Sequence, residues 1–122
     1  MITIDYKSRL PVYEQIKNQI MTLIQLEVLT TDQQLPSIRS LSAETGVNVN
    51  TVKRAIQDLE EMGIIYSVPG KGSFVSENAF SNSRIKEKAL DEIRYAIVSA
   101  IPKGVTEKDV AKLIEKIFEE VK

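Results

Sequence analysis

The sequence contains no cysteine, no histidine and no tryptophan among its 122 residues. Without cysteine a disulfide scaffold is excluded, and without cysteine or histidine the usual zinc ligands, nucleophile–base pairs and commonest general base are missing. No apolar run approaches the length of a membrane span, and the start MITIDYKSRLP has no apolar segment of signal-peptide length. We therefore expect a cytoplasmic protein that is not an enzyme, has no cofactor or metal, and does not bind a membrane.

The chain also has almost no excess of one charge over the other, because 16 basic and 17 acidic residues leave a formal net charge of −1. Nucleic-acid-binding domains are often basic, so this balance argues mildly against such a partner unless a basic face is hidden in the total. A hydrophobic content of 43% is sufficient for a core. The length suits one compact domain, or a small domain with an appendage.

Three helices are predicted in the first half of the chain. The first follows Pro11, a residue suited to a first helical turn, and the polar stretch LTTDQQLP after it is expected to be a connection. Ser37 can cap a short helix over IRSLSAETG that Gly46 ends, and the third helix begins at Asn48 or just after. The apolar residues of the first helix that recur near a period of 3.6 are Val12, Ile16, Ile20, Leu23, Ile24 and, at its edge, Leu26.

The third helix should be followed by a β-hairpin. Gly63 ends the helix, strand-forming residues occupy 64–68 and 74–75, and the turn Pro69–Gly72 separates them. A short helix, a glycine turn, a longer helix and a hairpin together make a winged helix-turn-helix domain, expected over residues 1–76. The expected buried stripe of the third helix is Val49, Val52, Ile56, Leu59 and Met62.

Residues 77–122 should form a separate two-helix tail after a linker or bend at 77–83. The first tail helix runs from about residue 84 to 100, PKGV breaks it, and Thr106 with Asp109 forms a capping-box pattern that starts the second. The apolar stripes are Ile85, Ala89, Ile93, Ile97 and Ile101, then Val110, Leu113, Ile114, Ile117, Phe118 and Val121. The predicted fold class is mainly α with a small β-hairpin: a winged helix-turn-helix domain followed by a short C-terminal helical hairpin.

The charges of the third helix run against its dipole. Lys53 and Arg54 come early, whereas the acids are held back to its far end, although a helix N-terminus favours negative charge. This arrangement makes sense if a polyanion docks at the N-terminal half, as DNA does on a recognition helix. The side chains expected to face outward there are Asn50, Thr51, Lys53, Arg54 and Gln57, which include groups that can read adenine and guanine.

Two neighbouring elements strengthen this interpretation. Ser37 and Arg39 lie at a helix N-terminus, where backbone N–H groups favour a phosphate, and Lys71 lies at a glycine-flanked hairpin tip. Polar residues often do no more than solvate an outer face. Here, however, all the basic residues between 35 and 76 fall on predicted contact elements, and we expect double-stranded DNA to be the partner.

Three blocks of the sequence resemble a known family. PVYEQIKNQI, LPSIRSLSAETGVNVNTVKRAIQDLEEMGII and PGKGSFV are similar to the DNA-binding domain of GntR-type bacterial transcription regulators, most of all the short-tailed YtrA-type branch. The resemblance implies that Ser37 and Arg39 contact the DNA backbone, with the arginine also near a base. Many members have a basic or hydroxyl residue where Val49 stands, so we interpret Val49 as a packing residue that at most touches a thymine methyl.

The resemblance also assigns the recognition helix and the wing. It implies that bases and phosphates are contacted by Asn48, Asn50, Thr51 and Lys53, with Arg54 on the same edge, and that Gly70, Lys71 and Gly72 form a wing tip near the minor groove.

The tail is too short to be the effector domain of the larger branches, since two short helices cannot enclose a typical ligand pocket. Their apolar stripes need a partner, and the resemblance implies a dimerisation appendage. The expected interface residues are Ile93, Ile97, Val110, Leu113, Ile114, Ile117 and Phe118. We hypothesise a twofold homodimer that reads an inverted repeat. In the alternative, the tail folds onto the winged domain of its own chain.

The expected function is sequence-specific transcription regulation, most often repression in the family that this sequence resembles. The competing hypothesis is a winged-helix protein–protein interaction module without specific DNA binding, because fold alone does not fix function. An unknown small-molecule effector between the winged domain and the tail, and regulation through expression level alone, both stay open.

Overall fold

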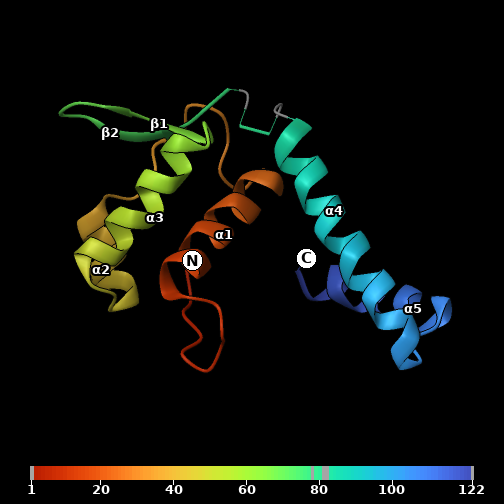
Figure 1. Cartoon of the computed structure of the whole chain (residues 1–122). Coiled ribbons are helices and arrows are strands. Elements are labelled where there is room, and N and C mark those ends of the chain that lie inside the picture. The colour runs from red at the N-terminus through yellow and green to blue at the C-terminus, as the bar shows by residue number, and fades with distance from the viewer. Residues whose placement is uncertain (1, 78, 81–82, 122) are drawn as a thin grey trace. The chain divides into compact units, whose positions relative to one another are not determined.

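The computed structural model describes residues 2–77, 79–80 and 83–121, which belong to two compact units, 1–81 and 82–122 (Figure 1). The first unit contains α1 (Val12–Gln25), α2 (Ile38–Thr45), α3 (Val49–Glu61), β1 (Ile65–Val68) and β2 (Gly72–Val75). The second contains α4 (Ser83–Ala100), the 3₁₀ turn η1 (Ile101–Lys103) and α5 (Glu107–Val121). The predicted mainly helical fold with a small hairpin is confirmed.

The end of the first unit lies beyond the winged helix itself. Ala79 is buried, with 8% of its surface exposed. The expected linker at 77–83 falls partly outside the described residues, which omit 78, 81 and 82.

The core of the first unit lies between α1 and α3. Ile16 and Ile20 of α1 and Val52, Ala55 and Leu59 of α3 are at most 1% exposed. Burial of a large aliphatic side chain contributes about 1.5–3 kcal/mol, so this contact holds α3 firmly in one orientation. The predicted stripes of both helices are confirmed in their central turns, and Ala55 is an additional member.

The predicted buried stripes are wrong at the start of α3 and at the end of α1. Val49 is 46% exposed, because the buried face of α3 begins one turn later, at Val52. Leu26 is 49% exposed, because α1 ends at Gln25 and the chain no longer follows the helical period.

The predicted caps of α2 are confirmed. The Ser37 Oγ accepts a hydrogen bond from the Ser40 N–H at 3.0 Å, and Gly46 ends the helix in a left-handed conformation with φ of 72°. Asn48 caps α3 in the same way, since its Oδ1 accepts from the Asn50 N–H at 2.8 Å. The turn between α2 and α3 is thereby defined at both of its ends.

A reciprocal cap starts α5, as predicted. The Thr106 N–H donates to the Asp109 carboxylate at 2.9 Å, and the Asp109 N–H donates to the Thr106 hydroxyl at 3.2 Å. The hydrogen bond from the Thr106 N–H, followed by that from its hydroxyl, lowers the pKa of Asp109. This cap fixes where the second tail helix begins.

The polar stretch between α1 and α2 is more than the connection that we expected. Gln34 forms an antiparallel bridge to Phe74 of β2. The Leu35 N–H donates to the Ser73 carbonyl at 2.8 Å, and the Val75 N–H donates to the Gln33 carbonyl at 3.0 Å. The stretch therefore acts as a short third strand, which satisfies the free edge of the hairpin.

Side chains of this stretch also hold the hairpin. The Gln34 Nε2 donates to the Lys71 carbonyl at 2.8 Å in the hairpin turn. The Tyr66 hydroxyl donates to the Asp32 carboxylate at 2.7 Å, which raises the pKa of Tyr66, and its ring stacks on Phe74 with centroids 5.5 Å apart. The stretch between α1 and α2 thus holds the hairpin at both its tip and its middle.

Gly72 should be the least replaceable glycine of the hairpin. Its φ is 127°, and an added Cβ would lie 2.8 Å from the Gln34 Nε2. The flexible amide can move away, but it then loses its bond to the Lys71 carbonyl. We expect Gly72→Ala to lower the free energy of unfolding by about 1–3 kcal/mol from backbone strain, with the lost hydrogen bond in addition. Urea denaturation measures this change.

Gly70→Ala is the matched control, because Gly70 also has a positive φ, 75°, but an added Cβ would meet no atom within 4 Å. It should cost less than Gly72→Ala. In a Gln34→Ala background the two costs should move closer together. Equal costs in the wild-type background would contradict the proposed role of Gln34.

Candidate nucleic-acid interface

The exposed face of α3 begins at its N-terminus. Asn50, Lys53, Arg54 and Gln57 are exposed and Thr51 is half-buried, whereas the side chains of the opposite face are in the core. Because Val49 is exposed, an apolar group accompanies these polar ones in the first turn. The face offers amide, hydroxyl, cationic and methyl groups, all of which can contact base edges in a major groove.

Arg54 lies at the edge of this face. Its guanidinium carbon is 3.8 Å from the centroid of the Tyr13 ring on α1, in a cation–π contact. Lys53 makes no such contact in the described part of the chain, so its ammonium is free for a ligand. The two neighbouring cations Lys53 and Arg54 therefore have different surroundings.

The acids of α3 are held away from its N-terminal half, as their order along the helix requires. Asp58 lies 3.8 Å from Lys17 of α1, which also pairs with Glu14 at 3.2 Å. Glu60 and Glu61 are exposed at the end of the helix. The surface potential should consequently change sign along α3, from positive near Lys53 to negative near Glu60.

The start of α2 adds backbone donors. The Ser37 hydroxyl is engaged as the cap, accepting from the Ser40 N–H and bonding the Ser40 hydroxyl at 3.0 Å. The N–H groups of Ile38 and Arg39 have no partner in the part of the chain that the structure describes. Such free N–H groups at a helix start favour an anion.

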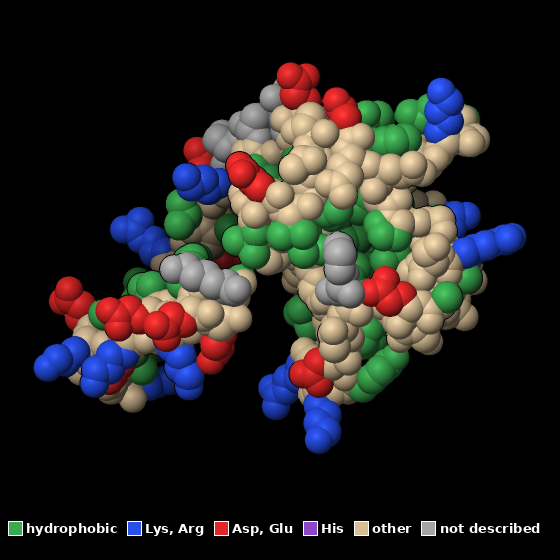
Figure 2. All heavy atoms as spheres, turned by 180° about the vertical axis from the view of Figure 1, so that it is seen from behind, with side chains coloured by type: hydrophobic (Ala, Val, Ile, Leu, Met, Phe, Trp, Pro, Cys, Tyr) green, Lys and Arg blue, Asp and Glu red, His purple; other side chains and the backbone are tan. Residues whose placement is uncertain are grey.

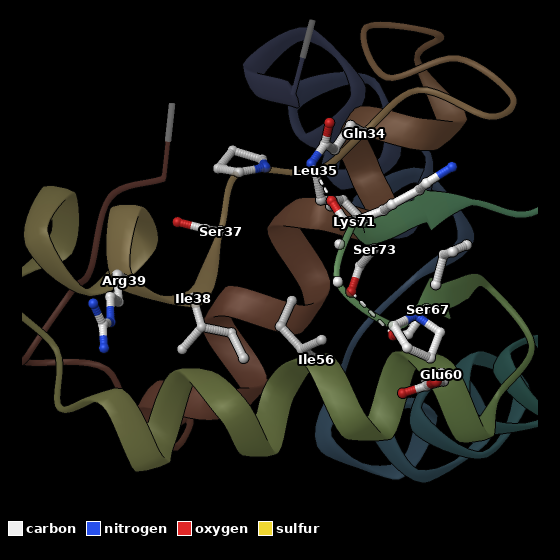
Figure 3. A pocket seen from close by; sticks show the side chains of 15 residues that line it. Gln34, Leu35, Ser37, Ile38, Arg39, Ile56, Glu60, Ser67, Lys71 and Ser73 are labelled. Atoms are coloured by element: carbon white, nitrogen blue, oxygen red, sulfur yellow. Dashed lines mark hydrogen bonds between the residues drawn. The ribbon is translucent and has the colours of Figure 1, made fainter.

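An open groove of about 670 Å³ separates the start of α2 from the hairpin (Figure 3). Its lining includes Ser37 and Arg39 at one end, Ile56 in its floor, and Glu60 near the hairpin. In Figure 3 Arg39 lies at the end of the groove near α2, and Glu60 lies at the other end. The two charged side chains Arg39 and Glu60 therefore lie at opposite ends of the groove, with the cation at the start of α2.

Gly70, Lys71 and Gly72 form the tip of the hairpin. The Lys71 N–H donates to the Val68 carbonyl at 2.9 Å, and Gly70 supplies the positive φ of the turn. The Lys71 side chain extends away from the groove in Figure 3. It can therefore reach a ligand that passes beyond the hairpin.

The predicted DNA-contact residues thus occupy one end of α2, the first half of α3 and the hairpin tip. Asn48 differs from the others because its side-chain oxygen Oδ1 is engaged as the α3 cap and is not free to contact DNA. Gln34 was missed: its role follows from the bridge to β2, and a polar residue in a polar connection gives no sequence signal for it.

The tail has no interior of its own, since no described side chain between 84 and 121 is buried. Among the residues predicted for the dimer interface, Ile97 and Val110 are half-buried, and the exposed ones are Ile93, Leu113, Ile114, Ile117 and Phe118, from 44% to 64%. Hydrophobic side chains reach the surface among charged ones in Figure 2. α4 and α5 meet near their joining turn, around a shallow apolar depression lined by Ile97, Ile101 and Val110 among others.

Within the described ranges, no helix is long and apolar enough to cross a membrane. The same residues contain no group of three or more acidic side chains arranged to hold a metal ion.

Comparison with known proteins identifies the family. Residues 12–75 match the family described as bacterial regulatory proteins, gntR family. The chain is 34% identical to the HTH-type transcriptional repressor YtrA of Bacillus subtilis over 125 residues, which cover all of this chain and 95% of that protein.

Solved structures agree with this match. A transcriptional antiterminator from Listeria monocytogenes EGD-e has a TM-score of 0.86 and 32% identity, covering 99% of this chain and 92% of the other. The structure of AraR(DBD) in complex with operator ORR3 has a TM-score of 0.55 and 36% identity, over 60% of this chain and 88% of that one. The family match spans more than half of the chain and includes α2, α3 and the hairpin. The chain therefore belongs to the gntR family of bacterial regulatory proteins.

Proposed function

We propose that this protein is a transcription repressor that binds an inverted-repeat operator as a homodimer. The observation that carries the proposal is the exposed, acid-free first half of α3 within a domain matched to the gntR family. The operator complex of the similar AraR domain supports DNA as the ligand, and the name of the YtrA repressor supports repression.

In this proposal α3 enters the major groove with its N-terminal half. Asn50 and Lys53 reach base edges, and Thr51 contacts a base or a phosphate. Arg54 is held beside Tyr13 at 3.8 Å, so it contacts the backbone at the margin of the groove. The exposed Val49 is placed to touch a thymine methyl, a contact that needs the exposure that the structure gives it.

The start of α2 and the hairpin tip contact the DNA on either side of α3. The free N–H groups of Ile38 and Arg39 and the Arg39 guanidinium bind a phosphate at the start of α2, where Ser37 acts as the helix cap. Lys71 approaches the minor groove from the hairpin. Gln34 keeps the turn in place through the Lys71 carbonyl, so the lysine is presented by a fixed backbone.

The tail supplies the second half of the proposal. Amphipathic helices whose apolar side chains stay 44–64% exposed need a partner, and a second copy of the chain offers a matching surface. The interface would use Ile93, Ile97, Val110, Leu113, Ile114, Ile117 and Phe118. Two winged domains related by a twofold axis would then read the two halves of an inverted repeat.

A protein–protein interaction module is not favoured. Such a module would be expected to have an apolar or acidic face on α3. Here only Val49 is apolar among the exposed residues of the first two turns, and the charged ones are the cations Lys53 and Arg54.

Arg39→Ala and Lys53→Ala should each weaken binding to the preferred duplex without unfolding the protein, since both side chains are exposed. If either side chain reads a base, the loss is about 1–3 kcal/mol and is confined to one base position. A phosphate contact instead gives a uniform loss over all sequences and a shallower salt dependence. Fluorescence anisotropy with duplexes substituted at single positions distinguishes the two roles.

Gln25→Ala is the control and should keep wild-type affinity, because it changes an exposed polar residue at the end of α1, outside the proposed contact elements. Wild-type affinity in both Arg39→Ala and Lys53→Ala would overturn the placement of the interface.

The wild-type chain should have twice the mass of one chain by light scattering at micromolar concentration. Ile117→Glu should shift it toward monomer, because Ile117 belongs to the proposed interface and a buried unpaired carboxylate is costly. Lys116→Glu changes the neighbouring residue by a larger charge and should stay dimeric. A clean wild-type monomer would contradict the dimer proposal.

A further inference from the structure

A loop at residues 6–10, the N-terminal loop, precedes α1 and belongs to none of the contact elements described above. Its residues are all exposed, with Tyr6 at 72% and Leu10 at 44%. In Figure 1 it forms an open loop just before the start of α1. It also precedes residues 12–75, the stretch matched to the gntR family.

One buried side chain holds both ends of this loop. Gln15 of α1 is 8% exposed. Its Nε2 donates to the Asp5 carbonyl at 3.0 Å and to the Leu10 carbonyl at 2.9 Å, while its Oε1 accepts from the Asp5 N–H at 2.9 Å. Gln19, one turn later, exchanges the same kind of pair with the backbone of Thr3. The loop is therefore preorganised, so a ligand would bind it without the full entropy of ordering it.

The loop carries two cations without a partner. In residues 1–81 the basic residues outside α2, α3 and the hairpin are Lys7, Arg9 and Lys17. Lys17 is paired with Glu14 and Asp58, whereas Lys7 and Arg9 form no ion pair within the described residues. Asp5 lies at the base of the loop, where its carboxylate accepts from the Lys7 N–H at 2.9 Å, and Glu14 in the first turn of α1 is paired with Lys17.

The loop lies at the same end of the unit as the start of α3. Tyr13 of α1 contacts Arg54, and Lys17, one turn later, contacts Asp58. Since these pairs follow the same order along both helices, α1 and α3 start at the same end. The loop, which leads directly into α1, thus lies at the end of the unit where the polar and cationic half of α3 begins.

We propose that the N-terminal loop is a further DNA-binding element, in which Lys7 and Arg9 contact backbone phosphates beside the groove that α3 enters. This proposal rests on the proposed function. A point-charge contact with phosphate carries no sequence information, so the loop adds affinity and salt dependence but leaves base preference to α3. The aromatic Tyr6 is the neighbour that can add a hydroxyl donor to the same phosphate.

The test compares full-length wild type with Lys7→Gln/Arg9→Gln on two duplexes, the preferred sequence and a scrambled one, over a range of salt concentrations. Each lost phosphate contact lowers the slope of log K against log salt by about 0.9, that is about 1.8 for each bound protomer. With equal affinities for the variant and the wild type at 1 M salt, this slope difference corresponds at 0.1 M salt to about sixty-fold weaker binding per protomer, on both duplexes. Lys53→Ala is measured beside it.

Two controls isolate charge and preorganisation. Lys7→Arg/Arg9→Lys keeps both charges and should retain wild-type affinity and slope. Gln15→Leu removes the three hydrogen bonds that hold the loop without changing charge, and should weaken both duplexes with no change in base preference.

The outcomes separate this proposal from the function on which it rests. If the wild type binds and Lys53→Ala weakens it, but the Lys7→Gln/Arg9→Gln variant keeps the wild-type affinity and slope, the loop proposal alone is overturned. A loss confined to the preferred duplex would also overturn it, because a phosphate contact cannot depend on base sequence. If the wild type binds neither duplex, the proposed function fails as well.

Discussion

The packing of α3 against α1 is the constraint on which the rest of the structure depends. Val52, Ala55 and Leu59 are fully buried, so α3 cannot rotate about its axis without exposing them. Sealing one face fixes which side chains form the other face. The same contact sets the parallel alignment of α1 and α3, which brings Tyr13 beside Arg54 and Lys17 beside Asp58. The packing of α3 in the core therefore also determines which of its side chains are exposed.

Polar contacts hold the irregular segments around this packed centre in place. The stretch between α1 and α2 pairs with β2 through Gln34, which also bonds the hairpin turn. At the opposite side, Gln15 bonds both ends of the N-terminal loop. In both places a glutamine amide satisfies backbone groups of an irregular segment, as buried or half-buried backbone requires. The segments that surround α3 are thus held by side-chain amides and backbone bridges in addition to buried apolar side chains such as Leu35 and Val75.

The regular elements could be predicted from the sequence, and the irregular ones could not. Period 3.6 located α1 and α3, and the capping residues Ser37, Gly46 and Thr106 marked helix ends, because these signals are local. Val49 was assigned to the core because periodicity does not show where a packing partner begins. The roles of Gln34 and Gln15 depend on contacts with backbone outside their own elements, which leave no pattern in the sequence. The sequence also does not identify what packs against the tail, because an apolar stripe carries no information about the surface that covers it.

The most direct test of the central claim is selection of bound duplexes from a random pool by the full-length protein, repeated at several salt concentrations. We expect enrichment of an inverted repeat, with half-sites about one helical turn apart or a multiple of it, for a dimer that places one α3 in each half-site. The preference should persist as salt weakens binding, because base contacts carry it. Binding only at low salt with no enriched sequence would show that the exposed face of α3 does not read bases, which would overturn the proposed function.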